Sequence, residues 1–126
     1  MTYHYDTLQT TTRGAFTVVV DKTWEDQPLA DQFDETEFDI AQLARDIDAG
    51  KTEYFQLRVR VFLDGVELAA EYMGGLLYAE PNDVLADGTA GSMKERALAD
   101  AVVQLAQLNQ KFTQVLKELP TVTTVH

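Results

Sequence analysis

Residues 54–68 read YFQLRVRVFLDGVEL, and this stretch decides the fold. Apolar and polar side chains alternate up to Asp64-Gly65, which is the pattern of a strand with one buried face. Asp-Gly between two such runs is typical of a two-residue hairpin turn, in which both positions adopt positive φ. We therefore predict an antiparallel hairpin formed by residues 53–63 and 66–78.

The turn also predicts which residues of the hairpin face each other, because a regular antiparallel ladder continues pair by pair from Leu63 and Val66. We expect the side with only apolar and aromatic residues to face the core. Its pairs are Leu63–Val66, Val61–Leu68, Val59–Ala70 and Leu57–Tyr72. The other side pairs Phe62–Glu67, Arg60–Ala69, Arg58–Glu71 and Gln56–Met73. Arg58 opposite Glu71 is a complementary charge pair, and Gly74-Gly75 predicts a bulge.

Two further strands are predicted nearer the N-terminus. Residues 15–20 (AFTVVV) are mostly β-branched or aromatic, as is typical of strands. Residues 3–8 are their predicted hairpin partner, with a turn near Arg13-Gly14. The polar residues 21–35, which include Pro28, predict an acidic loop.

Two helices are predicted by apolar residues at helical spacing. Residues 37–49 form the short one, with Thr36 as its N-cap and Gly50 as the left-handed residue after its end. Residues 93–118 form the long one, which begins with a capping box of Ser92 and Glu95. Residues 79–91, which contain Pro81, are predicted to be a loop.

Together these elements predict an α+β fold with a mainly antiparallel sheet of about four strands. We expect one acidic domain over residues 1–120 and a polar tail over residues 121–126. The long helix carries more apolar surface than one sheet face needs, so we also expect a homodimer through this helix. The surplus apolar residues are Ala97, Ala101, Val103, Leu108 and Val115.

Charge is distributed unevenly in a chain whose net charge is −11. Residues 21–48 carry −8, from ten acids against Lys22 and Arg45. The ten acids are Asp21, Glu25, Asp26, Asp31, Asp34, Glu35, Glu37, Asp39, Asp46 and Asp48. Such a field repels nucleic acid and anionic membranes and attracts basic protein surfaces. We therefore expect a basic protein partner, no direct nucleic-acid contact and no membrane contact.

Catalytic, metal and cofactor sites are not expected. The clustered carboxylates lie in a polar run that stays hydrated, which leaves no cause for the raised pKa that general acid catalysis needs. No EF-hand spacing occurs, cysteine is absent, and the two histidines are His4 and His126 near the termini. Ser92 is the sole serine, and its predicted capping role explains it. We predict that the protein is not an enzyme.

A cytoplasmic location is expected from three features. The first six residues lack the basic and apolar regions of a secretory signal. No apolar run approaches the ~18 residues that a membrane span requires. The absence of cysteine fits a reducing compartment.

Three aromatic residues, Trp24, Phe33 and Phe38, lie inside the acidic segment. They either pin the segment to the core or act as anchors in a charged interface. For the second reading, Trp24 is the preferred anchor. The predicted partner-binding residues are Trp24, Glu25, Asp26, Asp31, Asp34, Glu35, Glu37 and Asp39.

The stretch of residues 54–68 and the general plan of the chain resemble small acidic accessory proteins of phages and plasmids, of the anti-CRISPR or anti-restriction type. Some of those proteins mimic DNA. The resemblance implies an inhibitor of a host defence complex that handles nucleic acid. The alternatives are an immunity protein, a secretion-type chaperone with one protein partner, and a small-ligand domain. The last would have a pocket between the hairpin and the long helix, lined by Tyr54, Tyr72 and Tyr78.

Overall fold

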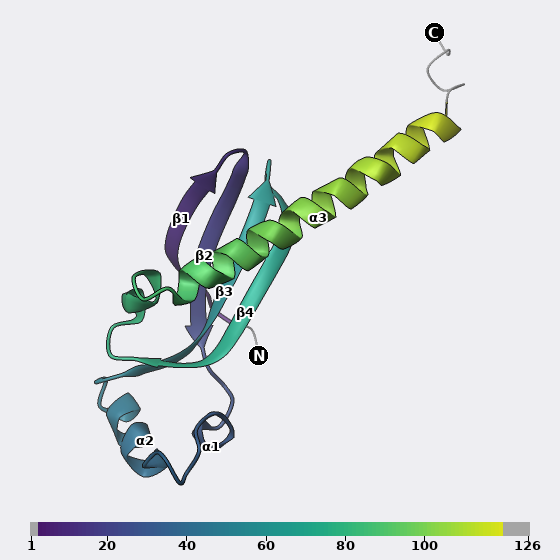
Figure 1. Ribbon diagram of the computed structural model, residues 1–126. Coiled ribbons are helices and arrows are strands. Elements are labelled where there is room, and N and C mark those ends of the chain that lie inside the picture. The colour runs from purple at the N-terminus through teal and green to yellow at the C-terminus, as the bar shows by residue number, and fades with distance from the viewer. Residues whose placement is uncertain (1–2, 120–126) are drawn as a thin grey trace.

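The computed structural model describes residues 3–119 and shows an α+β fold in which one sheet is crossed by one long helix (Figure 1). The sheet has four antiparallel strands in the order β1-β2-β3-β4. The strands are β1 (Asp6–Arg13), β2 (Phe16–Trp24), β3 (Glu53–Leu63) and β4 (Val66–Tyr78). The helices are α1 (Leu29–Gln32), α2 (Ile40–Asp48), the 3-10 helix η1 (Pro81–Leu85) and α3 (Thr89–Glu118). The predicted fold class is confirmed, and the predicted tail of residues 121–126 lies outside the described residues.

The core lies between α3 and one face of the sheet. Alternate residues of β2 and β3 point toward the helix and are buried, which follows from the two-residue period of a strand. From the sheet the core takes Val18, Val20, Phe55, Leu57, Val59 and Val61. From η1 and α3 it takes Val84, Ala90, Met93, Ala97, Leu98 and Ala101. The small alanines let the helix approach the sheet closely.

The β3–β4 hairpin has the predicted bounds and turn, but its predicted register is wrong beyond the first two pairs. Asp64 and Gly65 both have positive φ, and Leu63 faces Val66. A β-bulge then adds one residue to β4, so that Val61 faces Ala69 and Arg58 faces Tyr72. A second register shift accompanies the predicted bulge at Gly74-Gly75, where Gly75 has a φ of +72°.

The first bulge exchanges the two faces of β4, because a shift of one residue reverses every following side chain. Ala69 and Met73 pack against the core. Tyr72, which was expected in the core, is 62% exposed on the sheet face opposite α3. We call this the open face, because no helix covers it within residues 3–119.

The N-terminal hairpin is displaced from its predicted position. Its turn lies at Gly14 as expected, but the first strand covers residues 6–13 rather than 3–8. The second strand continues to Trp24, so residues 21–24 belong to the sheet and not to an acidic loop. Asp21 and Thr23 are buried, and their polar groups are satisfied by hydrogen bonds.

Both predicted helices begin at other residues than expected. The N-cap of α2 is Asp39, whose Oδ1 accepts a hydrogen bond from the Gln42 amide at 3.1 Å, and not Thr36. Gly50 after the helix has the predicted left-handed conformation, with a φ of +74°. The long helix begins at Thr89, so Ser92 lies within its first turn and is no cap. Part of the expected loop of residues 79–91 is thus helical.

The second half of α3 runs past the sheet into open space (Figure 1). Buried residues of α3 end at Ala101, and nearly all later residues up to Leu119 are exposed. In the described part of the chain, no helix is both long and apolar enough to cross a membrane.

Candidate functional site

The acidic residues gather in a small lobe beyond the end of the sheet, where β2 ends and β3 begins (Figure 1). We define this acidic lobe as residues 26–39, which include α1 and lead into α2. Six carboxylates in it are exposed, and no lysine or arginine lies between them. They are Asp26, Asp31, Asp34, Glu35, Glu37 and Asp39. Six of the eight predicted partner-binding residues therefore share one exposed segment.

Phe33 ties the acidic lobe to the sheet. Its ring packs edge-on against Phe38, with 5.2 Å between ring centroids, and lies 6.4 Å from the ring of Tyr54 on β3. The Tyr54 hydroxyl donates a hydrogen bond to the Gln27 carbonyl at 3.0 Å. Phe33 thus has the anchoring role that was one of the two predicted readings.

Trp24 and Phe38 remain available for contact with a partner. Trp24 is 44% exposed and Phe38 is 43% exposed. Trp24 also contacts Tyr3, at 5.8 Å between ring centroids, and Tyr3 donates a hydrogen bond to Asp26. This hydrogen bond raises the pKa of the Tyr3 hydroxyl.

Glu25 differs from the other predicted partner-binding residues because it is buried, with 7% exposure. Its carboxylate accepts hydrogen bonds from the Gly75 amide at 2.7 Å, the Gln27 amide at 3.1 Å and Gln56 Nε2 at 3.1 Å. Glu25 therefore joins the base of the lobe to β3 and β4 and adds no exposed charge. The sequence alone could not show that Glu25 is buried while its neighbour Asp26 is exposed.

Two acids of the lobe also shape its backbone. Asp34 Oδ1 accepts hydrogen bonds from the Thr36 amide at 2.8 Å and from the Thr36 hydroxyl at 2.7 Å. These bonds hold the pKa of Asp34 below its ordinary value, so this group keeps its negative charge at neutral pH. Asp39 caps α2 as described above. The turn therefore fixes the Asp34 carboxylate and favours its charged form.

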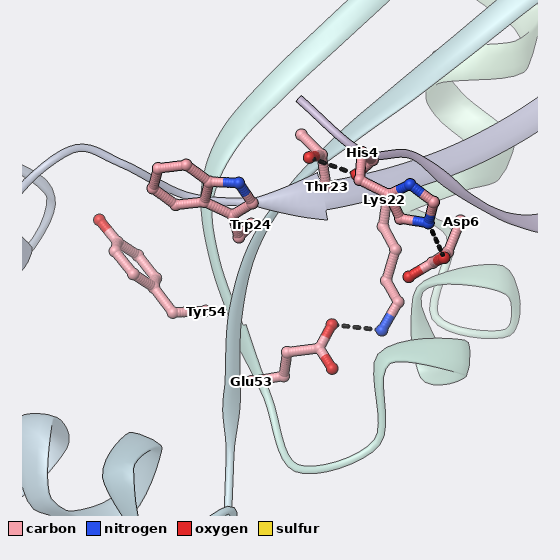
Figure 2. Close-up of a pocket in the computed structure, with 7 residues that line it drawn as sticks. All are labelled: His4, Asp6, Lys22, Thr23, Trp24, Glu53 and Tyr54. Carbon is pink, nitrogen blue, oxygen red and sulfur yellow. Dashed lines mark hydrogen bonds and ion pairs between the residues drawn. The ribbon is translucent and has the colours of Figure 1, made fainter. Parts of the chain in front are cut away.

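A pocket of about 250 Å³ lies beside the lobe, under Trp24 (Figure 2). Its walls carry an ion pair between Lys22 and Glu53 and a contact of 3.2 Å between His4 Nε2 and Asp6 Oδ1. The lining residues are His4, Asp6, Lys22, Thr23, Trp24, Glu53 and Tyr54. This polar lining was not predicted, because only the fold brings together β1, β2, β3 and His4, which precedes β1.

The predicted pocket between the hairpin and α3 is filled by core side chains instead. Of its three expected lining residues, Tyr54 faces the pocket beside the lobe and Tyr72 lies on the open face. Tyr78 packs on Phe55 and donates a hydrogen bond to Asp87. Within the described residues, no group of three or more histidine, aspartate or glutamate side chains could hold a metal ion.

Comparisons with protein-family models, curated proteins and solved structures found no match to this chain.

Proposed function

We propose that the protein binds a basic protein surface through its acidic lobe and blocks that surface. The observation that carries the proposal is the group of six exposed carboxylates, uninterrupted by any basic residue, next to two exposed aromatic rings. Carboxylates spaced along a surface resemble the charge that lysine and arginine grooves attract. The proposed target is therefore a phosphate-binding surface of a complex that handles nucleic acid, and the class of function is an inhibitor such as an anti-CRISPR or anti-restriction protein.

The roles within the proposed interface follow from the side chains. The carboxylates would accelerate the encounter with a basic surface and orient the two proteins. Trp24 and Phe38 would supply the apolar contact that slows dissociation, because aromatic anchors carry much of the energy of interfaces. Glu25 would act only indirectly, by holding the base of the lobe.

The test compares two variants with equal net charge. The lobe variant carries Asp31→Asn, Asp34→Asn, Glu35→Gln and Glu37→Gln, and it keeps Asp39 because that residue caps α2. The amide oxygen that Asp34→Asn introduces can still accept the Thr36 hydrogen bonds, so the turn is preserved. The control variant removes four exposed acids outside the lobe through Asp64→Asn, Asp83→Asn, Asp100→Asn and Glu118→Gln.

The assay is displacement of host-cell proteins from DNA-cellulose. Purified wild type and control variant are expected to release the same basic proteins, and the lobe variant is expected to release none. Salt alone also releases basic proteins from DNA, so release is counted above that caused by buffer of the same salt concentration. This added release should weaken as salt rises, because exposed charges are screened. Equal release by the lobe and control variants would contradict the proposal.

The alternative of an immunity protein or chaperone predicts another pattern in the same material. One partner would then remain bound to immobilised protein at high salt and would also bind the lobe variant. That result would move the interface to another surface of the molecule.

A further inference from the structure

The face of α3 that contacts the sheet continues without interruption beyond the sheet. Residues three or four apart lie on one side of a helix. The sheet-facing row of Ala90, Met93, Ala97 and Ala101 is extended by Leu105, Leu108, Phe112, Val115 and Leu119 at the same spacing. Val102 and Leu116 flank this extension on one side. We call residues 102–119 the helix extension.

Most of the apolar side chains of the helix extension are open to solvent. Phe112 is 59% exposed, and the others exposed are Val102, Val103, Leu105, Val115, Leu116 and Leu119. A helix of this length is only marginally stable in water without tertiary contacts. Apolar patches of this extent on a soluble chain indicate an interaction site.

We propose that a second copy of this chain covers the helix extension, with the two extensions packed antiparallel. The first argument is charge. Twenty of the 21 acidic residues precede Val102, whereas the helix extension carries only Lys111, Lys117 and Glu118. Within residues 3–119, the helix extension is thus a long surface on which two strongly acidic chains can meet with few carboxylates near the contact.

The second argument concerns orientation. The exposed row continues the sheet-facing row of the same helix. A second helix packed parallel on this row would therefore place its own N-terminal half in the space that the sheet occupies. An antiparallel helix would end near the sheet instead. It would also separate the two acidic bodies by the length of the extensions, about 27 Å. Their repulsion is screened over a Debye length of about 8 Å at physiological salt.

The spacing of the row gives a self-complementary pairing centred at Gln110. Leu108 then meets Phe112 of the second copy, and Leu105 meets Val115 of the second copy. Each contact occurs twice, as an interface with two-fold symmetry requires. The positions that flank the row between residues 104 and 116 are Gln104, Asn109, Lys111 and Leu116. No carboxylate lies beside this part of the seam, and Lys111 of each copy can extend its ammonium group into solvent.

The first experiment measures mass in solution by sedimentation equilibrium. Wild type is expected at twice the chain mass of 14.1 kDa. Phe112→Gln should weaken the association by roughly 10- to 100-fold, because two buried rings are lost per dimer. Val103→Gln is the matched control: Val103 is 56% exposed but lies off the row, so its dimer should be unchanged. A monomeric wild type at high micromolar concentration would overturn the proposal, and so would equal effects of both variants.

The second experiment measures orientation. Since the chain has no cysteine, Asp100→Cys provides a single site for a spin label. Antiparallel extensions place the two labels more than about 30 Å apart, at 1.5 Å per residue from Gln110. Parallel extensions would place them within about 20 Å, given the usual distance between packed helices. The shorter distance would overturn the antiparallel arrangement.

The inference does not rest on the proposed function, and salt separates the two. Self-association through the helix extension should persist or strengthen as salt rises, because salt screens the repulsion between acidic bodies. Partner binding through the acidic lobe should weaken over the same range. A dimer that dissociates with salt would point to a contact through charged groups and contradict the proposed interface.

Discussion

Asp21 is a buried carboxylate that holds two arginines on the open face of the sheet. It is 1% exposed, and its Oδ2 accepts hydrogen bonds from Arg58 Nε at 3.0 Å, Arg58 Nη2 at 2.5 Å and Arg60 Nη2 at 3.0 Å. Thr7 donates a fourth bond to Oδ1 at 3.1 Å. Tyr5 stacks on the Arg58 guanidinium at 3.5 Å. The most basic part of the sheet is thus organised by an acid that the sequence alone assigns to the acidic surface.

We predict that Asp21→Asn destabilises the protein by about 3 kcal/mol, because it leaves Arg58 without its counter-charge and Arg60 with only the longer contact to Glu67 at 3.7 Å. The measurement is urea denaturation at neutral pH. Asp31→Asn serves as control, since this exposed acid should change the free energy of unfolding by less than about 0.5 kcal/mol. Equal effects of the two substitutions would show that the Asp21 network contributes nothing to stability.

Asp87 offers a pH-dependent contact at the start of α3. The Tyr78 hydroxyl and the Thr89 amide both donate hydrogen bonds to its carboxylate, and they hold the pKa of Asp87 below its ordinary value of 3.8. A lowered folded-state pKa means that the stabilisation is present above the ordinary value and is lost as the pH falls through the folded-state value.

We therefore predict that Tyr78→Phe raises the pKa of Asp87 toward its ordinary value, as followed by NMR titration of the carboxyl carbon. Asp34 is the internal control, because its lowered pKa depends on Thr36 and should not change. An unchanged Asp87 titration in Tyr78→Phe would assign the shift to Thr89 alone.

At the scale of elements, β4 shows how one extra residue changes a hairpin. The bulge brings Met73 to the core and Tyr72 to the open face. We predict that Met73→Ala costs about 2 kcal/mol of stability, whereas Tyr72→Ala costs less than about 1 kcal/mol. A regular hairpin would give the opposite order. Denaturant midpoints of the two variants therefore test the register directly.

The sequence predicted both strands of this hairpin to the residue, because the Asp64-Gly65 turn and the alternation are local signals. It could not predict the first bulge, since the pairing of Val61 with Ala69 depends on packing against α3 and not on the local residue types. The same limit applies to Arg58, whose partner Asp21 lies 37 residues away. The start of α2 was missed because Asp39 and Thr36 are both good caps, and only the fold decides between them.

For the candidate site, the sequence located the acidic segment and its aromatic residues but not their roles. The acidic residues of a segment are read directly from its sequence, so the six exposed carboxylates of the lobe could be predicted as a group. Whether a residue is buried depends on contacts with residues far away in the sequence. Glu25 is buried because its carboxylate accepts a hydrogen bond from the Gly75 amide on β4. The pocket beside Trp24 likewise required the pairing of β1, β2 and β3.

At the scale of the whole molecule, charge is divided between a strongly acidic body and a nearly neutral helix extension. A net charge of −11 destabilises the compact state through self-repulsion, and the repulsion is greatest where carboxylates cluster. The acidic lobe should therefore dominate the effect of salt on stability, whatever its partner.

We predict that raising salt from low to high concentration increases the Tm of the wild type by about 3–5 °C, which corresponds to about 1 kcal/mol for a domain of this size. The lobe variant should gain much less, because four of the six clustered charges are already gone. The control variant, with the same net charge, should respond nearly as the wild type does, since its four acids lie far apart. Differential scanning calorimetry below the concentration of self-association would measure all three. Identical salt responses of the two variants would mean that net charge alone matters and that the carboxylates of the lobe are too dispersed to act together on a partner.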